Sequence, residues 1–300
     1  MTLVTSTVTV TDAHRRYAVE AILDDLRPSG DALPIGVLLR PAFNGETLLS
    51  FDPSVQTITV SAYDRSLWYL LAEHESREPT TKERLLEKYR GVTPPPPTIQ
   101  IWRETAIVSA STGFRNTLSA SFQEAIAESG SLGGADGISV LGFSFERGAE
   151  VRFADWSPRP GSKSHRFVHL LYEVARQNLA STEVERRLEE LHGYLALGLP
   201  WRVMSSSPLV VRIFGSLSTT ELPELRAALE QLPLTEPIVL DLSRLAGMGT
   251  LLYPMWRQWL EGRRNVRWVV GDGAAFHLES IGVPAGVQHR DLSSALDGLR

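Results

Sequence analysis

An apolar run that ends in an acidic residue and a tight loop constrains the C-terminal third of the chain more than any other feature. Pro237-Ile238-Val239-Leu240 continues without a polar break into Asp241-Leu242-Ser243. Such a run is typical of a central strand that is covered on both faces. A loop with Gly247 and Gly249 follows, and apolar residues then recur at helical spacing from Leu251 to Leu260. The pattern predicts a strand, a tight loop and a helix, with the loop at the carboxyl end of the strand, where open α/β sheets place their sites.

Alternating strand and helix patterns extend on both sides of this run. The expected elements are, in order, a strand at 209–214, a helix at 219–232, the strand and helix just described, a strand at 266–270, a short helix around 276–281, a small strand near 286–288 and a last helix at 291–299. Strands that alternate with helices in this way predict an α/β domain. We place it at residues 201–300.

The order of elements in residues 201–300 resembles the STAS domain (sulfate transporter and anti-sigma-factor antagonist). The residues that carry the resemblance are Phe214-Gly215-Ser216-Leu217, Leu222-Pro223-Glu224-Leu225-Arg226, Leu240-Asp241-Leu242-Ser243 and Leu278-Glu279-Ser280-Ile281-Gly282. The resemblance is limited to the last third of the chain. It implies a β-α-β-α domain that binds a protein partner through the surface around Ser243, Gly249, Thr250 and Tyr253.

The chain departs from this family at the start of the helix that follows Asp-Leu-Ser. The family's antagonists have an Asp-Ser pair there, and a partner kinase phosphorylates the Ser; Gly249-Thr250 stand in its place here. Thr250 therefore has two interpretations. The resemblance implies a phosphoacceptor, whereas its position before an apolar helix predicts an N-cap whose hydroxyl stabilises the helix by about 1 kcal/mol. The loss of the acidic neighbour favours the cap.

Length and amino-acid composition limit the number of domains, the cellular location and the kinds of site that the chain can have. The 300 residues are more than one average domain and predict two or three. A formal net charge of −5 provides no general attraction to nucleic acid or to an anionic membrane. The absence of cysteine excludes disulfides, thiolate metal sites and a Cys nucleophile, and it fits a cytoplasmic chain. No apolar run approaches the roughly 20 residues that span a bilayer, so we expect a cytoplasmic protein without membrane insertion.

Residues 1–200 have the pattern of a mixed-sheet α/β region that resembles no family. Pro94-Pro95-Pro96-Pro97 is the clearest interruption, because four prolines favour polyproline II and exclude a helix or an interior strand. We interpret these prolines as a stiff connector rather than as a ligand for an aromatic groove. They leave open a division of this region into two subdomains near 94–97. The predicted fold class is therefore α/β, with a region of unknown family followed by a STAS-like domain.

A short basic segment, 159–166, is the strongest candidate for a site outside the C-terminal domain. It leads into an amphipathic helix, and a helix N-terminus with cations close by can hold a phosphate or a carboxylate. The candidate anion-binding residues are Ser162, Lys163, His165 and Arg166. A capped helix start in solvent is the simpler interpretation, because the spacing is not that of a nucleotide P-loop and short basic runs are common on surfaces. His165 and His169 are four residues apart, as metal ligands are, but no third ligand lies nearby and we expect no metal site.

No catalytic motif is found. A Gly-x-Ser-x-Gly elbow, a Gly-x-Gly-x-x-Gly fingerprint and a Walker lysine are all missing from the sequence. We therefore expect a non-enzymatic cytoplasmic regulator or scaffold without a cofactor, whose STAS-like domain binds a kinase or another signalling protein in bacterial-type signalling. Homo-oligomerisation is left open. The alternative is a small-anion-binding or nucleotide-binding N-terminal domain, with or without catalysis, to which the STAS-like domain is an accessory.

Overall fold

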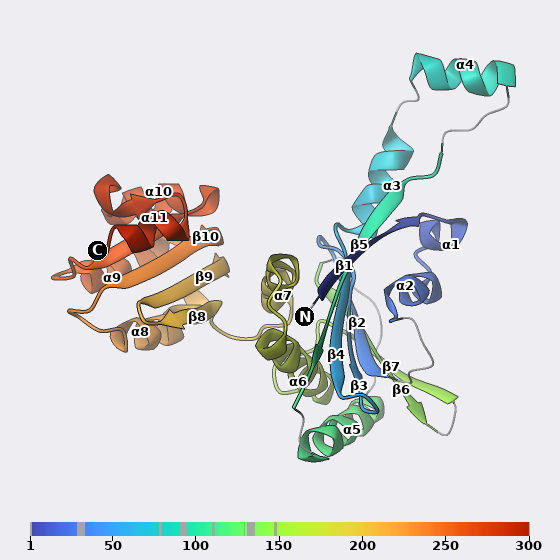
Figure 1. Cartoon of the computed structure of the whole chain (residues 1–300), viewed down its shortest axis with the longest axis horizontal. Helices are drawn as coiled ribbons and strands as arrows, with labels where there is room; N and C mark the ends of the chain where they lie inside the picture. Colours follow the sequence, from blue (N-terminus) through green and yellow to red (C-terminus); the bar gives the residue numbers. More distant parts are fainter. Residues whose placement is uncertain are drawn as a thin grey trace. The chain divides into compact units, whose positions relative to one another are not determined.

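The chain forms two compact units. The computed structural model describes residues 2–28, 34–77, 80–90, 95–109, 112–128, 130, 136–146 and 149–299. Unit 1 is Met1–Leu195 and unit 2 is Ala196–Arg300, whereas the predicted division lay between Pro200 and Trp201. The α/β class is confirmed: each unit combines one sheet with packed helices (Figure 1).

Unit 1 is organised around an antiparallel sheet. In the described part of the chain its strand order is β1-β5-β4-β3-β2-β6-β7. The strands are β1 (Thr2–Thr9), β2 (Ile35–Pro41), β3 (Thr47–Asp52), β4 (Thr57–Tyr63), β5 (Thr98–Ile107), β6 (Ile138–Glu146) and β7 (Ala149–Trp156). All of these pairings are antiparallel, so the mixed sheet expected for this region is wrong in this detail. Short turns join β2 to β3 and β3 to β4, and such turns can connect only antiparallel neighbours.

The prolines at 94–97 do not divide unit 1. Pro94 lies outside the described residues, and Pro95 to Pro97 lead directly into β5 without regular secondary structure. β5 lies between β1 and β4, so strands from both sides of the prolines pair in one sheet. The carbonyl of Pro97 also accepts a hydrogen bond from the Val10 N–H, at 2.9 Å.

Helices cover both faces of this sheet (Figure 1). The helices of unit 1 are α1 (Asp12–Arg15), α2 (Val19–Leu26), α3 (Leu67–Ser76), α4 (Thr81–Arg90), α5 (Thr112–Ala127), α6 (Lys163–Asn178) and α7 (Thr182–Tyr194). On one face, α2 and the start of α3 bury Ile22, Leu23 and Leu67 against Leu38 and Leu48 of the sheet. On the other face α6 packs on β3 and β4, next to α5 and α7. This second face is filled by aromatic rings, with Phe122, Phe153 and Phe167 in mutual contact.

Unit 2 has the alternating order that the sequence predicts. Among the described residues its sheet has the order β12-β11-β10-β9-β8, in which only β8 is antiparallel to its neighbour. The strands are β8 (Trp201–Ser206), β9 (Leu209–Leu217), β10 (Ile238–Met248), β11 (Val266–Val270) and β12 (Gln288–His289). The helices are η1 (Thr219–Glu221), α8 (Leu222–Glu230), η2 (Thr250–Leu252), α9 (Tyr253–Leu260), α10 (Asp272–Ile281), η3 (Ala285–Val287) and α11 (Leu292–Asp297).

The core of unit 2 lies between the sheet and helices α8, α9 and α10. Trp256 of α9 and Trp268 of β11 are fully buried there, with ring centroids 5.8 Å apart. Leu240 of β10 belongs to the same cluster. Val239 faces the opposite side and packs towards α11 through Ala295. β10 is thus apolar on both faces, as a central parallel strand requires.

β10 extends further than predicted, and Thr250 does not cap the following helix. The predicted loop with Gly247 and Gly249 is mostly strand: β10 continues to Met248, with register shifts against β9 after Asp241 and after Leu245. Such bulges let a strand continue through a sequence that lacks a regular period. Gly249 occupies the N-cap position of η2, and no side-chain capping bond forms. The predicted Thr250 cap is therefore wrong.

Candidate functional site

The carboxyl ends of β9, β10 and β11 form one edge of unit 2, and η2 and α10 begin there. The Gly249 N–H donates to the Leu217 carbonyl at 2.8 Å, which joins the ends of β10 and β9. We call this region the strand-end surface. It is formed by the exposed Ser243, Thr250, Leu251 and Phe276 and the partly buried Gly249, Tyr253 and His277. The four docking residues expected from the sequence, Ser243, Gly249, Thr250 and Tyr253, thus all belong to this edge.

His277 connects α10 to the end of β10 and to the start of α9. Its Nε2 accepts a hydrogen bond from the Met248 N–H at 3.1 Å, and its Nδ1 lies 2.8 Å from the Tyr253 hydroxyl. Because Nε2 is an acceptor, a neutral ring carries its proton on Nδ1 and donates it to the Tyr253 oxygen. These two bonds fix three elements of the strand-end surface relative to one another.

Two large apolar side chains project from this fixed frame into solvent. Leu251, two residues before Tyr253, is 76% exposed, and Phe276, next to His277, is 68% exposed. Neither belongs to the unit 2 core. Their positions close to Tyr253 and His277 in the sequence make Leu251 and Phe276 candidates for contact with a partner.

A buried ion pair lies beneath this edge. The Arg212 Nε donates to the Asp241 Oδ2 at 2.8 Å, and Asp241 is only 1% exposed. The other carboxylate oxygen accepts the Ser243 N–H at 3.0 Å. Asp241 therefore fixes the backbone at the first register shift of β10 and positions Ser243, which gives the Asp-Leu-Ser motif a structural role.

The basic helix start of unit 1 faces acidic groups of its own chain. Ser162 caps α6 by accepting the His165 N–H at 3.2 Å, and the Lys163 N–H donates to Glu128 at 2.6 Å. The Ser164 hydroxyl donates to Asp155. Carboxylates thus already occupy the place where an external anion would bind.

The side chains of the same segment point to different partners. Arg166 donates to the Glu124 carboxylate at 2.8 Å on the surface, whereas the His165 ring is buried with Nε2 2.9 Å from the Leu195 carbonyl. Burial lowers the pKa of His165 below its ordinary value, which disfavours a cationic ring. The structure does not bring Lys163, His165 and Arg166 together in one pocket.

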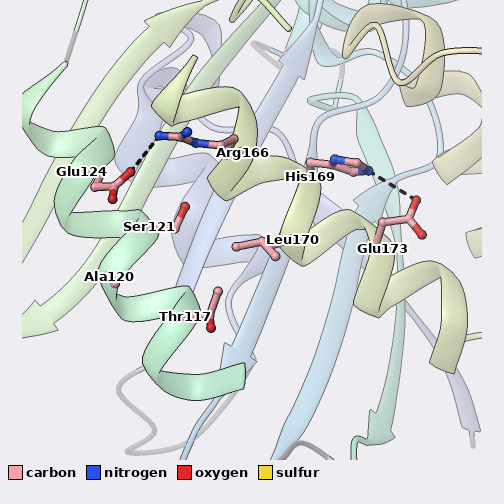
Figure 2. Close-up of a pocket in the computed structure, with 8 residues that line it drawn as sticks. All are labelled: Thr117, Ala120, Ser121, Glu124, Arg166, His169, Leu170 and Glu173. Carbon is pink, nitrogen blue, oxygen red and sulfur yellow. Dashed lines mark hydrogen bonds and ion pairs between the residues drawn. The ribbon is translucent and has the colours of Figure 1, made fainter. Parts of the chain in front are cut away.

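A groove of about 560 Å³ lies between α5 and α6. It is lined by Thr117, Ala120, Ser121, Glu124, Arg166, His169, Leu170 and Glu173 (Figure 2). Its basic side chains lie next to acidic ones within the groove: Arg166 contacts Glu124 at 2.8 Å, and His169 lies 3.7 Å from Glu173. Among the described residues, no group of three or more His, Asp or Glu side chains is placed so that it could hold a metal ion.

Unit 1 also buries an acidic group that the sequence analysis missed. Glu46 is 0% exposed; it accepts the Tyr17 hydroxyl on one oxygen and the Leu67 N–H, at 3.1 Å, on the other. The guanidinium of Arg40 lies over the Tyr17 ring, 4.1 Å from its centroid. Burial raises the pKa of the Glu46 carboxyl and outweighs these hydrogen bonds, which lower it. The only indication in the sequence is a lone acidic residue directly before the apolar strand at Thr47–Asp52.

Glu46 predicts a specific pH dependence of stability. Because its pKa is raised in the folded state, the folded chain binds this proton more tightly than the unfolded chain. The stability that protonation contributes is present below the unfolded pKa, near 4.3, and is lost as pH rises through the folded pKa. The free energy of unfolding of the wild type, minus that of Glu46→Gln, should therefore fall as pH rises above the unfolded pKa and through the raised folded pKa.

Denaturant unfolding at a series of pH values measures this difference. Glu75→Gln, at an exposed position of α3, is the control and should differ little from the wild type. A difference between wild type and Glu46→Gln that stays constant or grows with pH would contradict the raised pKa.

Comparisons with known proteins identify no relative of this chain. No protein-family model matches the chain, and searches of curated proteins and of solved structures give no match either. Within the part of the chain that the structure describes, none of the helices has both the length and the apolar character to cross a bilayer.

Proposed function

We propose that this chain is a non-catalytic regulatory or scaffold protein of the cytoplasm that binds a protein partner through the strand-end surface. The observation that carries the proposal is the exposure of Leu251 and Phe276, which lie close in sequence to Tyr253 and His277, the two residues whose side chains contact each other. Protein interfaces typically have an apolar centre that includes aromatic rings, and polar groups surround this centre. The carboxyl end of parallel strands is also where open α/β sheets bind their ligands.

The proposal includes the STAS-like character of residues 201–300 and a role in signalling. The alternating order of unit 2 supports it, as does the place of Asp241 in a buried pair beneath the surface. Thr250 remains a phosphoacceptor candidate, because its side chain is exposed and makes no capping bond. A phosphate there would add about −1.5 to −2 charges beside an apolar contact, which would oppose docking of a partner.

We do not extend the proposal to an anion or nucleotide site at Ser162, Lys163, His165 and Arg166. The first-turn donors and the Arg166 guanidinium already contact acidic groups of the chain, which are Glu124, Glu128 and Asp155.

Comparative capture tests the proposed docking surface. The full chain is immobilised and exposed to a lysate of its source, and captured proteins are quantified by mass spectrometry. Phe276→Glu should reduce capture of at least one protein by about tenfold, because loss of a central apolar contact costs 1–2 kcal/mol or more. Leu251→Glu should act in the same direction, and Thr250→Glu should do so if phosphorylation regulates docking.

Leu234→Glu is the matched control, since Leu234 is 69% exposed but lies in the loop before β10, at the opposite end of that strand. It should leave capture unchanged. Equal melting temperatures for all variants would exclude unfolding as the cause. If Phe276→Glu and Leu251→Glu capture the same proteins as the wild type in the same amounts, the strand-end surface is not the docking site.

A further inference from the structure

The two sheets differ in how their edges are protected. An edge strand exposes unpaired backbone N–H and C=O groups, and soluble proteins protect it with charges, bulges or very short strands. Among the described residues the edge strands are β1 and β7 in unit 1 and β8 and β12 in unit 2. β7 carries Glu150 and Arg152. β8 carries Arg202 and a register shift between Val203 and Ser205, and β12 has only 2 residues.

β1 has none of these protective features: it has no charged residue and no bulge, and it is not short. Its 8 residues are Thr, Ser, Val and Leu alone, without a charge, a proline or a glycine. It pairs with β5 without a register shift, from Thr2 opposite Thr105 to Thr9 opposite Thr98. Val4 is 54% exposed, and the side chains from Thr5 to Thr7 are exposed as well. β1 is thus a regular strand of high β-propensity next to β5 (Figure 1), and none of the described strands pairs with its other edge.

We propose that β1 pairs with the β1 strand of a second copy of this chain. The pairing would be antiparallel about a two-fold axis and would join the unit 1 sheets of the two copies into one. A second copy fits this edge better than an extended peptide, because its β1 is already ordered by β5. A free peptide would lose about 1–2 kcal/mol per residue in backbone entropy on binding. The lack of charge also fits self-pairing, since no like charges come to lie opposite each other.

The side-chain alternation of a strand restricts the register of this pairing. Residues that lie opposite each other in an antiparallel pair must point to the same face, so the two-fold axis passes through a residue. An axis at Ser6 places Val4 opposite Val8 and Thr5 opposite Thr7. An axis at Thr5 instead places Val4 opposite Ser6. The first register pairs Val with Val and Thr with Thr, which are favourable cross-strand pairs, and we assign it.

The mass of the full chain in solution tests the pairing. Analytical ultracentrifugation over a concentration series should show a dimer for the wild type. Ser6→Lys should weaken the dimer by at least about tenfold, because it places two ammonium groups opposite each other. Val55→Lys is the control: Val55 is 60% exposed in the turn between β3 and β4, and this variant should dimerise like the wild type. Thermal melting checks that both variants are folded.

A cysteine at the axis tests the register, because the chain has no cysteine of its own. Directly opposite residues in an antiparallel pair have Cα atoms about 4.5–5.5 Å apart, within the range of a disulfide. Mild oxidation should therefore link Ser6→Cys into a covalent dimer, whereas Val55→Cys should stay unlinked under the same conditions. A wild type that is monomeric at every concentration, or a dimer that Ser6→Lys leaves intact, would overturn the proposal. Binding of a different protein to β1 in place of a second copy would overturn it as well.

Discussion

Asp241→Ala should destabilise unit 2 by about 3–5 kcal/mol, because it removes one member of the buried ion pair between Asp241 and Arg212. The pair is nearly inaccessible, with Asp241 1% and Arg212 9% exposed, and the Nε to Oδ2 distance is 2.8 Å. The substitution also removes the acceptor of the Ser243 N–H. The first register shift of β10 should therefore loosen, and the strand-end surface with it.

The double variant Arg212→Leu/Asp241→Leu separates the charge effect from the packing effect. Replacing both members by leucine removes the two buried charges together, so this variant should recover most of the lost stability. Denaturant unfolding followed by tryptophan fluorescence measures both changes, since Trp256 and Trp268 are buried in the core of unit 2. A double variant as unstable as Asp241→Ala would show that the ion pair contributes through packing alone.

The helices and strands of unit 2 are predicted well because the patterns that indicate them involve residues that are close together in the sequence. Apolar runs such as Val266–Val270 and the helical spacing after Leu251 depend on neighbouring residues. The extension of β10 to Met248 does not depend on neighbouring residues, because it results from pairing with β9 through two register shifts. The error at Thr250 has the same origin: with β10 extended, Gly249 takes the N-cap position. The resemblance of this unit to the STAS domain stays a prediction.

The arrangement of unit 1 depends on partners that are distant in the sequence. The pattern of β5 predicts a strand, but nothing local places it between β1 and β4. Likewise, the basic segment before α6 suggests free cations, and only the fold brings Glu124 to Arg166 and Glu128 to the Lys163 N–H. Glu46 was missed for the same reason, since its partner Tyr17 lies on another element.

Gly273→Ala should destabilise unit 2 by about 1–3 kcal/mol, although helix propensity alone predicts a gain of up to about 1 kcal/mol. Gly273 lies in the first turn of α10, directly beneath the extended part of β10. A Cβ atom at this position would lie 2.1 Å from the Leu245 carbonyl oxygen and 3.0 Å from that of Ala246. Both are backbone atoms, so the clash can be relieved only by moving α10 away from β10.

That movement should also reach the proposed docking surface, because α10 carries His277 and Phe276. Displacement of α10 would lengthen the hydrogen bond between the Met248 N–H and His277, so Gly273→Ala should lose partner capture together with stability. Gly247→Ala is the control within the same segment of β10, since a Cβ there meets no atom within 4 Å; it should change the free energy of unfolding by no more than about 0.5 kcal/mol. Gly273→Ala would stabilise the protein only if a Cβ atom at this helical position met no other atom. That result would contradict the close approach of β10 to α10, and α10, which carries Phe276, would then be held less firmly.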